Sequence, residues 1–456
     1  MKNYDVIVIG SGAGTIVSDE AAEQDLKVAL IDKGPLLGGT CLNWGCIPSK
    51  MLVYTADRIV EIEEAKKLGI KAEIKNIDFK SIMERMRESR QESNVHIREG
   101  LKQSTNLEFY EGEGHFIGDH LLEVNGEKLK GKRIFIASGS RPFIPPIKGW
   151  DKVNYLTNES VLELNERPDS LIIIGGGYIA VEFGHFFAAM GTKVTIIEMA
   201  NRLVLSEEPE ISDLLKIELS KRMAVYTNTL AEEIKETENG ILVVTKDTNT
   251  GKITEYTAKR IMMAVGRRSN ADILKVKNTG VETDKKGFIK VSEYLETNQK
   301  DVFAIGDANG KQMFRHMANR EAEIVAQNVF YGKKMKVDYS AVPHAVYSHP
   351  QIASVGLTEA QARENYDILV GRMKYFDIAK GEAMVEKEGF AKAIVEKDSS
   401  KILGFHIIGP FAPELIQEVV NAMTSGGGME ELWQGIHIHP ALSELVLYTL
   451  SSLEKS

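Results

Sequence analysis

Short apolar runs that end in glycine-rich turns recur along this chain. The first run, residues 4–9, meets Gly10, and a helical stretch then leads to a second apolar run at residues 28–32. The same order returns where residues 170–174 run into three consecutive glycines and a helix leads to residues 194–198. Short apolar runs bounded by glycine are typical of buried strands. The pattern therefore predicts two strand–turn–helix–strand units.

The first turn has the features of a dinucleotide-binding loop. Gly10 permits the tight turn, and Gly12 lets the backbone approach a pyrophosphate at the N-terminus of the helix. Asp32, at the end of the second strand, lies at the usual distance along the chain to bind ribose hydroxyls. Thr15 occupies the position where a glycine or alanine usually allows close packing of helix on strand. For this motif alone, an α/β turn without a ligand is the alternative.

The second turn repeats the motif with Gly175 and Gly177 and has Ala180 at the third position. Two such units in the same context imply two bound nucleotides. Glu198 ends the second strand of this unit. A carboxylate accepts a hydrogen bond from a free 2′-hydroxyl but repels the 2′-phosphate of NADP. Glu198 therefore favours NAD as the second nucleotide.

The only two cysteines, Cys41 and Cys46, are separated by four residues. This spacing differs from a thioredoxin-type CxxC, and a zinc site would need further Cys or His ligands nearby. A small intramolecular disulfide fits better, and two buried, unpaired cysteines are the alternative. Pro48 stands where a helix could begin, so that Cys46 would lie beside free backbone N–H groups that favour a thiolate. We predict that Cys46 is a redox thiol.

Composition narrows the class of protein. A length of 456 residues suggests about three domains, and 39 glycines suit repeated phosphate-binding turns. The net charge of -9, without a long basic tract, argues against nucleic acid and anionic membranes as partners. No apolar run reaches membrane-spanning length, and the first strand follows Met1 too closely for a signal peptide. We expect a cytoplasmic protein, in a compartment that suits a cycling disulfide.

Three further motifs make a resemblance specific. Residues 137–142 read Ala-Ser-Gly-Ser-Arg-Pro, residues 264–267 Ala-Val-Gly-Arg, and residues 301–307 Asp-Val-Phe-Ala-Ile-Gly-Asp. With the two dinucleotide motifs and the cysteine pair, the chain resembles the flavin-dependent pyridine nucleotide-disulfide oxidoreductases over essentially its whole length. The resemblance implies an α/β fold with two Rossmann-like dinucleotide-binding domains, for FAD and NAD, and a C-terminal α+β dimerisation domain.

Proline and glycine residues between the motifs, and the order of the motifs, divide the chain into four predicted segments. These are 1–149 for the FAD-binding domain with the redox disulfide, 150–266 for the NAD-binding domain, 267–338 for a central segment that returns to FAD, and 339–456 for the dimerisation domain. In the last segment, residues 391–396 and 402–407 predict an antiparallel hairpin. A helix is expected from Pro413 to Met423.

The resemblance also assigns catalytic roles around the cysteines. Cys41 would exchange with substrate thiols, and Cys46 would face the flavin. Lys50, just after the cysteine motif, and Glu182, in the helix of the second unit, would pair near flavin N5, where hydride arrives. A cation there would stabilise the reduced anionic flavin, and the glutamate would hold it in place.

Near the C-terminus, the family's His-Pro-x-x-x-acid pattern selects His439 and Glu444. The imidazole would be the acid/base for the substrate thiol, because it titrates near neutrality, and Glu444 would orient it. The resemblance implies that His439 comes from the other subunit, so that a homodimer is required for activity. His437 is the competing candidate, but it lacks the adjacent proline and the correct distance to Glu444.

The remaining site residues follow the cofactor motifs. For FAD we expect Gly10, Gly12, Gly14, Asp32, Lys33, Gly39, Thr40, Lys50, Ser138, Gly139, Gly306 and Asp307, and for NAD we expect Gly175, Gly177, Tyr178, Ile179, Glu198 and Gly266. In the family, the counterpart of Asp307 bonds the ribityl chain of FAD. We expect no metal, because His344 and His349 lack acidic or thiol neighbours in the sequence.

The implied activity is dihydrolipoyl dehydrogenase: electrons pass from dihydrolipoamide, or a lipoyl protein, through the cysteine pair and FAD to NAD. Ser49 and Glu198 argue against glutathione reductase, and the lack of further cysteines argues against mercuric reductase. Thr15 and residues 51–54, 269–272 and 439–441 resemble mycothione reductase, so that an NAD(P)H-dependent reductase of a small thiol disulfide is the alternative. A flavoprotein scaffold with idle thiols is the third hypothesis.

Overall fold

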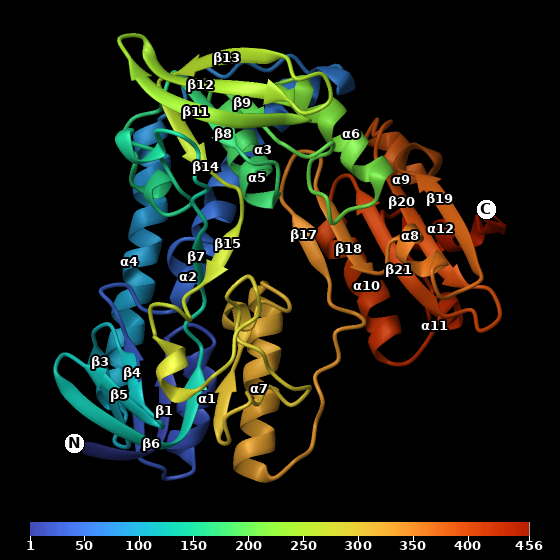
Figure 1. The fold of residues 1–456 in the computed structure, drawn as a ribbon. Helices are drawn as coiled ribbons and strands as arrows, with labels where there is room; N and C mark the ends of the chain where they lie inside the picture. The colour runs from blue at the N-terminus through green and yellow to red at the C-terminus, as the bar shows by residue number, and fades with distance from the viewer. Residues whose placement is uncertain (456) are drawn as a thin grey trace.

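The computed structural model describes residues 1–455 and begins with a sheet built on the first predicted unit (Figure 1). The parallel strands, in spatial order, are β3 (Leu107–Glu111), β2 (Val28–Asp32), β1 (Lys2–Ile9), β6 (Glu127–Ile136) and β16 (Val302–Ala304). β4 (His115–Gly118) and β5 (Leu121–Val124) extend the sheet antiparallel beside the first half of β6. The last four residues of β1 are all buried, as expected for a strand covered on both faces.

Two helices cover one face of this sheet. α1 (Gly14–Glu23) buries Gly14, Val17, Ser18 and Ala21, which share one helical face. It packs beside α7 (Arg315–Tyr331), and both helices contribute to one apolar cluster with Val6 and Val8 of β1. The carboxyl ends of the parallel strands therefore face the same space as the N-termini of α1 and α7.

The second unit forms a smaller parallel sheet with an antiparallel layer beside it. Its strands, in spatial order, are β10 (Ala224–Tyr226), β9 (Lys193–Ile197), β8 (Ser170–Ile174) and β14 (Arg260–Met263). The antiparallel layer, at the top of Figure 1, consists of β11 (Thr229–Thr237), β12 (Gly240–Asp247) and β13 (Ile253–Ala258). α5 (Tyr178–Ala189) connects β8 to β9 as predicted, and β7 (Ser140–Pro142) pairs with β15 (Arg267–Ser269) between the two sheets.

Helices that follow the first sheet's strands reach across to the second unit. α2 (Gly39–Asn43) leads into α3 (Cys46–Glu64), which packs against α5 and the long α4 (Phe79–Gln103). Leu52 and Ala56 of α3 share an apolar cluster with Phe79 of α4 and Phe186 of α5. The helix predicted to begin at Pro48 begins two residues earlier, at Cys46, whose backbone N–H lies in the first turn as expected.

The last part of the chain is an antiparallel sheet with helices on it. Its spatial order is β17 (His344–Val346), β18 (Ile352–Gly356), β21 (Ile402–Ile408), β20 (Phe390–Glu396), β19 (Ile368–Lys374) and β22 (Glu454–Lys455). The helices are α8 (Glu359–Arg363), α9 (Ala379–Ala383), α10 (Ala412–Thr424), α11 (Met429–Gln434) and α12 (Glu444–Ser451). The predicted hairpin is confirmed as β20 and β21, and the helix predicted from Pro413 to Met423 is α10.

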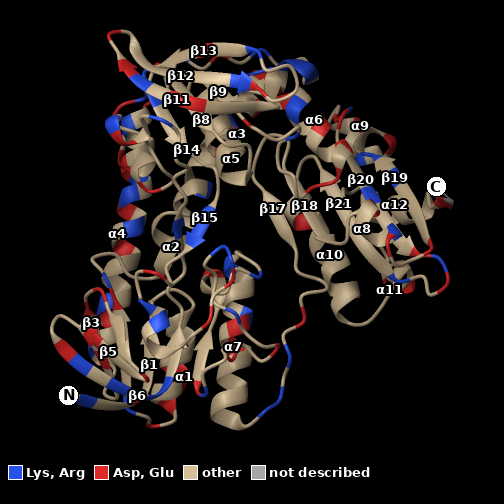
Figure 2. Ribbon diagram, in the orientation of Figure 1, with Lys and Arg blue, Asp and Glu red and all other residues tan. Residues whose placement is uncertain are grey.

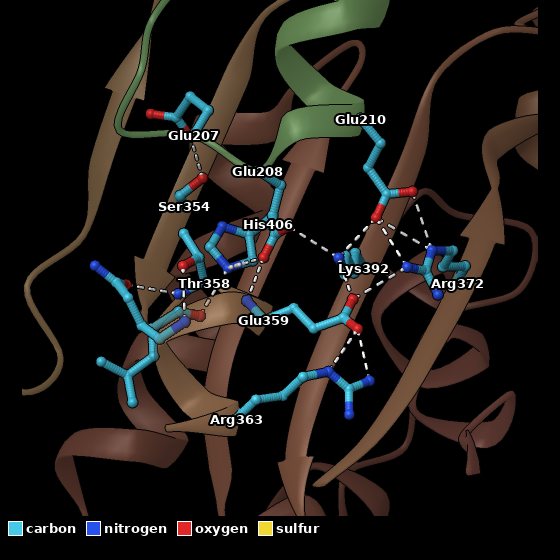
Figure 3. A network of polar contacts seen from close by, with 12 residues as sticks. Glu207, Glu208, Glu210, Ser354, Thr358, Glu359, Arg363, Arg372, Lys392 and His406 are labelled. Atoms are coloured by element: carbon cyan, nitrogen blue, oxygen red, sulfur yellow. Dashed lines mark hydrogen bonds and ion pairs between the residues drawn. The ribbon is translucent and has the colours of Figure 1, made fainter. Parts of the chain in front are cut away.

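A buried ionic network joins the second unit to the C-terminal sheet (Figure 3). Lys392, on β20, is 2 % exposed, and its Nζ lies 2.9 Å from Glu208, 2.7 Å from Glu210 and 2.7 Å from Glu359. Glu208 precedes α6 (Pro209–Ser220) of the second unit, and Glu210 lies in its first turn. The three carboxylates are close enough together to hold a metal ion, but the ammonium of Lys392 already binds all three.

The sequence-based expectations about the whole fold divide into two groups. The mixed α/β class and the separate C-terminal α+β layer are confirmed, whereas the four domain boundaries stay predictions.

None of the helices within residues 1–455 is both long and apolar enough to cross a bilayer. Figure 2 shows Lys and Arg interspersed with Asp and Glu on the outer elements, for example along α4.

Candidate active site

A cavity of about 1310 Å³ lies at the carboxyl ends of the first sheet. That edge of a parallel sheet is where nucleotides bind in open α/β folds. The predicted FAD residues that line it are Gly10, Gly12, Asp32, Lys33, Gly39, Thr40, Lys50, Ser138, Gly139, Gly306 and Asp307. Four of the six predicted catalytic residues also line it, namely Cys41, Cys46, Lys50 and Glu182.

The first glycine-rich turn is shaped by contacts that exclude side chains. Gly10 has φ +107°, and a Cβ there would lie 2.3 Å from the carbonyl oxygen of Ala137. Gly14 does not line the cavity; a Cβ on it would lie 2.8 Å from Val8 Cγ1. Close packing of helix on strand therefore requires a glycine at position 14, and its predicted role toward the cofactor stays a prediction.

Two acidic residues of the cavity are held by the hydroxyl groups of serines that are not among the predicted site residues. Ser11 donates to Asp32 Oδ2 from its backbone N–H at 2.7 Å and from its hydroxyl at 2.6 Å. Ser140 donates to Asp307 Oδ2 at 2.6 Å and accepts from Arg267 Nε at 2.7 Å. These contacts fix both carboxylates at the cavity wall.

Cys41 and Cys46 are free thiols in this structure and correspond to the dithiol form of the predicted pair. Cys41 lies in α2 and Cys46 begins α3, and their side chains are hydrogen-bonded to each other. That bond, together with the charge of Lys50, lowers the pKa of Cys46 to about 7 against the opposing effect of burial. The same bond raises the pKa of Cys41 well above its usual range. Cys46 is therefore the sulfur that carries the negative charge.

The predicted Lys50–Glu182 pair is present beside Cys46. Lys50 Nζ lies 2.9 and 2.8 Å from the two carboxylate oxygens of Glu182, whose side chain is 4 % exposed. Tyr347 completes the pair: its backbone N–H donates to Glu182 Oε1 at 3.0 Å, and its ring centroid lies 4.5 Å from Lys50 Nζ. The Lys50 ammonium and the Tyr347 N–H hold the buried carboxylate of Glu182 in place, and this carboxylate holds the ammonium at the cavity.

His439 and Glu444 form a separate pair near the C-terminus. His439 Nδ1 lies 2.8 Å from Glu444 Oε1, and the N–H of Ala441 donates to the other carboxylate oxygen at 3.0 Å. These contacts hold the pKa of Glu444 below its usual range. The imidazole is 68 % exposed, and within the chain it does not line the cavity that holds the cysteines. His437 pairs instead with Glu418, at 2.8 Å.

A second cavity of about 380 Å³ lies at the carboxyl ends of the second sheet. Its lining includes every predicted NAD residue, namely Gly175, Gly177, Tyr178, Ile179, Glu198 and Gly266. A Cβ on Gly175 would lie 2.3 Å from the carbonyl oxygen of Ala264, whereas Gly177 has open space around it. Tyr178, Ile179, Arg267 and Met313 line both cavities, so that the two sites adjoin.

Comparison with known proteins agrees with this geometry. The sequence profile described as pyridine nucleotide-disulphide oxidoreductase matches residues 4–322. The chain belongs to this family. The dimerisation domain of the pyridine nucleotide-disulphide oxidoreductases matches residues 342–449, which supports a homodimer. Family membership also supports FAD as cofactor, and the glycine cradle at Gly10 and the size of the first cavity fit it.

Relatives within the family differ in substrate. Dihydrolipoyl dehydrogenase of Geobacillus stearothermophilus is 35% identical over 451 residues, covering 97% of this chain and 94% of the relative. Mycothione reductase of Mycobacterium tuberculosis is 34% identical over 466 residues, covering 99% of this chain and 100% of the relative. The HOCl-induced flavoprotein disulfide reductase RclA from Escherichia coli is 29% identical with a TM-score of 0.87, covering 98% of this chain and 99% of that one. The chain is thus a flavoprotein disulfide oxidoreductase of this family.

Proposed function

We propose that this protein is a dihydrolipoyl dehydrogenase that oxidises dihydrolipoamide and reduces NAD. The observation that carries the proposal is the position of Cys46. Its acidic thiol is hydrogen-bonded to the side chain of Cys41 and lies beside the Lys50–Glu182 pair. Both cysteines line the first cavity, which shares lining residues with the second cavity. A thiol pair at the junction of two nucleotide sites suits electron transfer between a dithiol and a nicotinamide.

The two cysteines divide the thiol chemistry. With the pair as a disulfide, a substrate thiolate attacks Cys41, the Cys41–Cys46 bond breaks, and Cys46 leaves as a thiolate. A pKa of about 7 and the charge of Lys50 make Cys46 the better leaving group. The second substrate thiol then attacks the mixed disulfide and releases Cys41. The substrate dithiol loses two electrons and two protons, and the enzyme disulfide gains the two electrons. Cys41, whose pKa is raised, takes up one proton, and the other leaves through the base to solvent.

His439 would move a proton in this exchange. Its Nδ1 is held by Glu444, which leaves Nε2 on the exposed side of the ring to accept a proton from the substrate thiol. Because His439 of the same chain lies away from Cys41, we propose that the base at each site is His439 of the partner subunit. The dimerisation-domain match is consistent with this arrangement.

Each cofactor would be held by one cavity. FAD would lie against Gly10, Gly12, Asp32 and Asp307, and when bound it supplies the relay of two electrons between the dithiol and the nicotinamide. NAD would lie against Gly177 and Glu198. The carboxylate of Glu198, held by the N–H of Ala200 at 2.6 Å, would accept from a ribose hydroxyl and repel a 2′-phosphate.

The second candidate is an NAD(P)H-dependent reductase of a small thiol disulfide. It is favoured by the mycothione reductase relative, whose identity to this chain is nearly equal to that of the dihydrolipoyl dehydrogenase. The resemblance of Thr15 to that class points the same way. A steady-state comparison on FAD-loaded protein decides between the two: dihydrolipoamide with NAD or NADP, against small disulfides with NADH or NADPH.

The proposed function predicts fast NAD-linked oxidation of dihydrolipoamide that is lost in Cys41→Ser and His439→Ala. Weak lipoamide activity with strong reduction of a small disulfide would establish the second candidate. Inactivity with every dithiol and disulfide would contradict both assignments and leave the scaffold hypothesis.

A further inference from the structure

Arg315 is a cation in the first cavity that has no hydrogen-bond or ion-pair partner among the residues that the structure describes. It begins α7 and lines the cavity together with Cys41. Among residues 1–455 its guanidinium makes no hydrogen bond or ion pair, whereas Arg141 is held by Asp272 and Arg267 by Ser140. An arginine usually satisfies its five donors when it is partly buried. The free guanidinium is therefore available to a group that enters or forms in the cavity.

The guanidinium lies where the first glycine-rich turn meets α2. A Cβ built on Gly12 would lie 3.6 Å from Arg315 Nη1 and equally 3.6 Å from the Cα of Gly39. Gly39 begins α2, and Cys41 is two residues further along that helix. Arg315 is near enough to Cys41 for its charge to lower the pKa of that thiol, against the larger effects of Cys46 and burial.

We propose that Arg315 is the cation that stabilises negative charge on Cys41, as Lys50 does for Cys46. The inference rests on the proposed function, in which Cys41 is the sulfur that meets the substrate. When the second substrate thiol attacks the mixed disulfide, Cys41 leaves as a thiolate, and the guanidinium of Arg315 is a cation whose charge acts on that sulfur. The same charge would favour substrates that bear a carboxylate near the sulfur.

The groups that face Cys41 come from two elements. Cys46 approaches from the start of α3 and Arg315 from the start of α7, while Lys50 and Glu182 lie on the side of Cys46 and shift its pKa in opposite directions. Removing Cys46 therefore isolates the effect of Arg315. In that background Cys41 is the only cysteine, and every thiol signal comes from it.

The test is alkylation of Cys41 in FAD-loaded Cys46→Ser protein, with neutral iodoacetamide and with anionic iodoacetate, from pH 5 to pH 10. In each reaction the thiolate displaces iodide. Adding Arg315→Met is expected to slow alkylation at pH 7 about tenfold, to move the midpoint to higher pH, and to lower the ratio of iodoacetate to iodoacetamide rates. Arg315→Lys should restore most of the rate and the ratio. Arg320→Met, on the same helix and paired with Glu323, should leave both unchanged.

An unchanged midpoint and an unchanged reagent ratio in Arg315→Met would overturn the proposal. Arg315→Gln serves as a second neutral variant if Arg315→Met does not fold, and the same result with it would equally overturn the proposal. The assay needs no substrate, so that it separates this inference from the proposed function. If Arg315→Met slows alkylation of Cys41 but the wild-type protein does not turn over dihydrolipoamide, only the substrate assignment is refuted.

Discussion

The acidity of Cys46 arises from neighbours on its own helix and on the preceding one. Cys41 donates a hydrogen bond that stabilises the Cys46 thiolate, and Lys50, one turn along α3, adds a positive charge. Burial favours the neutral thiol but does not outweigh these two effects. In the dithiol state Cys46 therefore loses its proton at lower pH than Cys41 does.

Removing the hydrogen-bond donor should reverse this balance. In Cys41→Ala we expect the pKa of Cys46 to rise, because the largest stabilising effect on the thiolate is lost, and alkylation at pH 7 should slow about tenfold. The pH profile of iodoacetamide alkylation measures it. Ser49→Ala is the matched control, since the Ser49 hydroxyl donates to the backbone carbonyl of Cys46, at 3.4 Å, and not to its sulfur. A midpoint that stays near pH 7 in Cys41→Ala would contradict this account.

At the scale of elements, the two glycine-rich turns are alike in shape but use their glycines differently. Gly175 has φ +112°, and its missing side chain makes room for the carbonyl of Ala264. Gly177 has an ordinary φ and open space, so that its missing side chain is useful only to a ligand. The missing side chain of Gly175 therefore serves the fold, and that of Gly177 serves ligand binding.

Alanine substitutions should separate these two roles. We expect Gly175→Ala to lower the unfolding temperature clearly, because its Cβ meets backbone in a strained conformation. Gly177→Ala should melt like the wild type yet bind NADH about tenfold more weakly. Thermal melts and NADH titrations of the FAD-loaded variants provide both measurements. Equal NADH affinity of Gly177→Ala and wild type would show that the second cavity is not the nicotinamide site.

Local sequence patterns predicted the helices and strands well. They did not predict contacts between residues that lie far apart in the sequence. The strand–turn–helix–strand order identified β1, β2, β8, α5 and β9, because burial and glycine leave a mark on neighbouring residues. Pro48 marked the start of α3 only to within two residues, since proline suits several positions in a first turn. Tyr347 supports Glu182 across 165 positions, and no periodicity in the sequence records such a contact.

At the scale of the whole molecule, the network around Lys392 fixes the second unit on the C-terminal sheet (Figure 3). Glu208 is 1 % exposed and also receives the backbone N–H of Glu359. Glu207, beside it, binds His344 at 2.6 Å and Ser354 at 2.6 Å. Buried charges of this kind depend on every partner being present.

Lys392→Met should therefore destabilise the protein strongly, by about 3 kcal/mol in the free energy of unfolding, because Glu208 would be left buried without its cation. Urea unfolding measures the change. Adding Glu208→Gln should recover part of the loss, since it removes the uncompensated charge. Lys397→Met, which removes an exposed partner of Asp367, should have little effect. A Lys392→Met protein as stable as wild type would show that the network does not hold the two parts together.

The separation of His439 from the cysteines within one chain makes a prediction about subunit mixing. Cys41→Ser and His439→Ala homodimers should each be nearly inactive. After unfolding and refolding them together, half of the dimers would be mixed and would contain one intact site, which restores roughly a quarter of wild-type turnover. A mixture with no more turnover than its parents would show that each site takes its histidine from its own chain.

The central claim is that the cysteine pair exchanges electrons with a nicotinamide through FAD, and thiol counting after anaerobic reduction tests it most directly. Oxidised, FAD-loaded protein is treated with NADH, quenched with iodoacetamide, and digested to identify alkylated cysteines. We expect both Cys41 and Cys46 to be alkylated after NADH treatment, and neither to be alkylated without NADH or without FAD. Reduction of the flavin by NADH with both cysteines still protected would contradict the account.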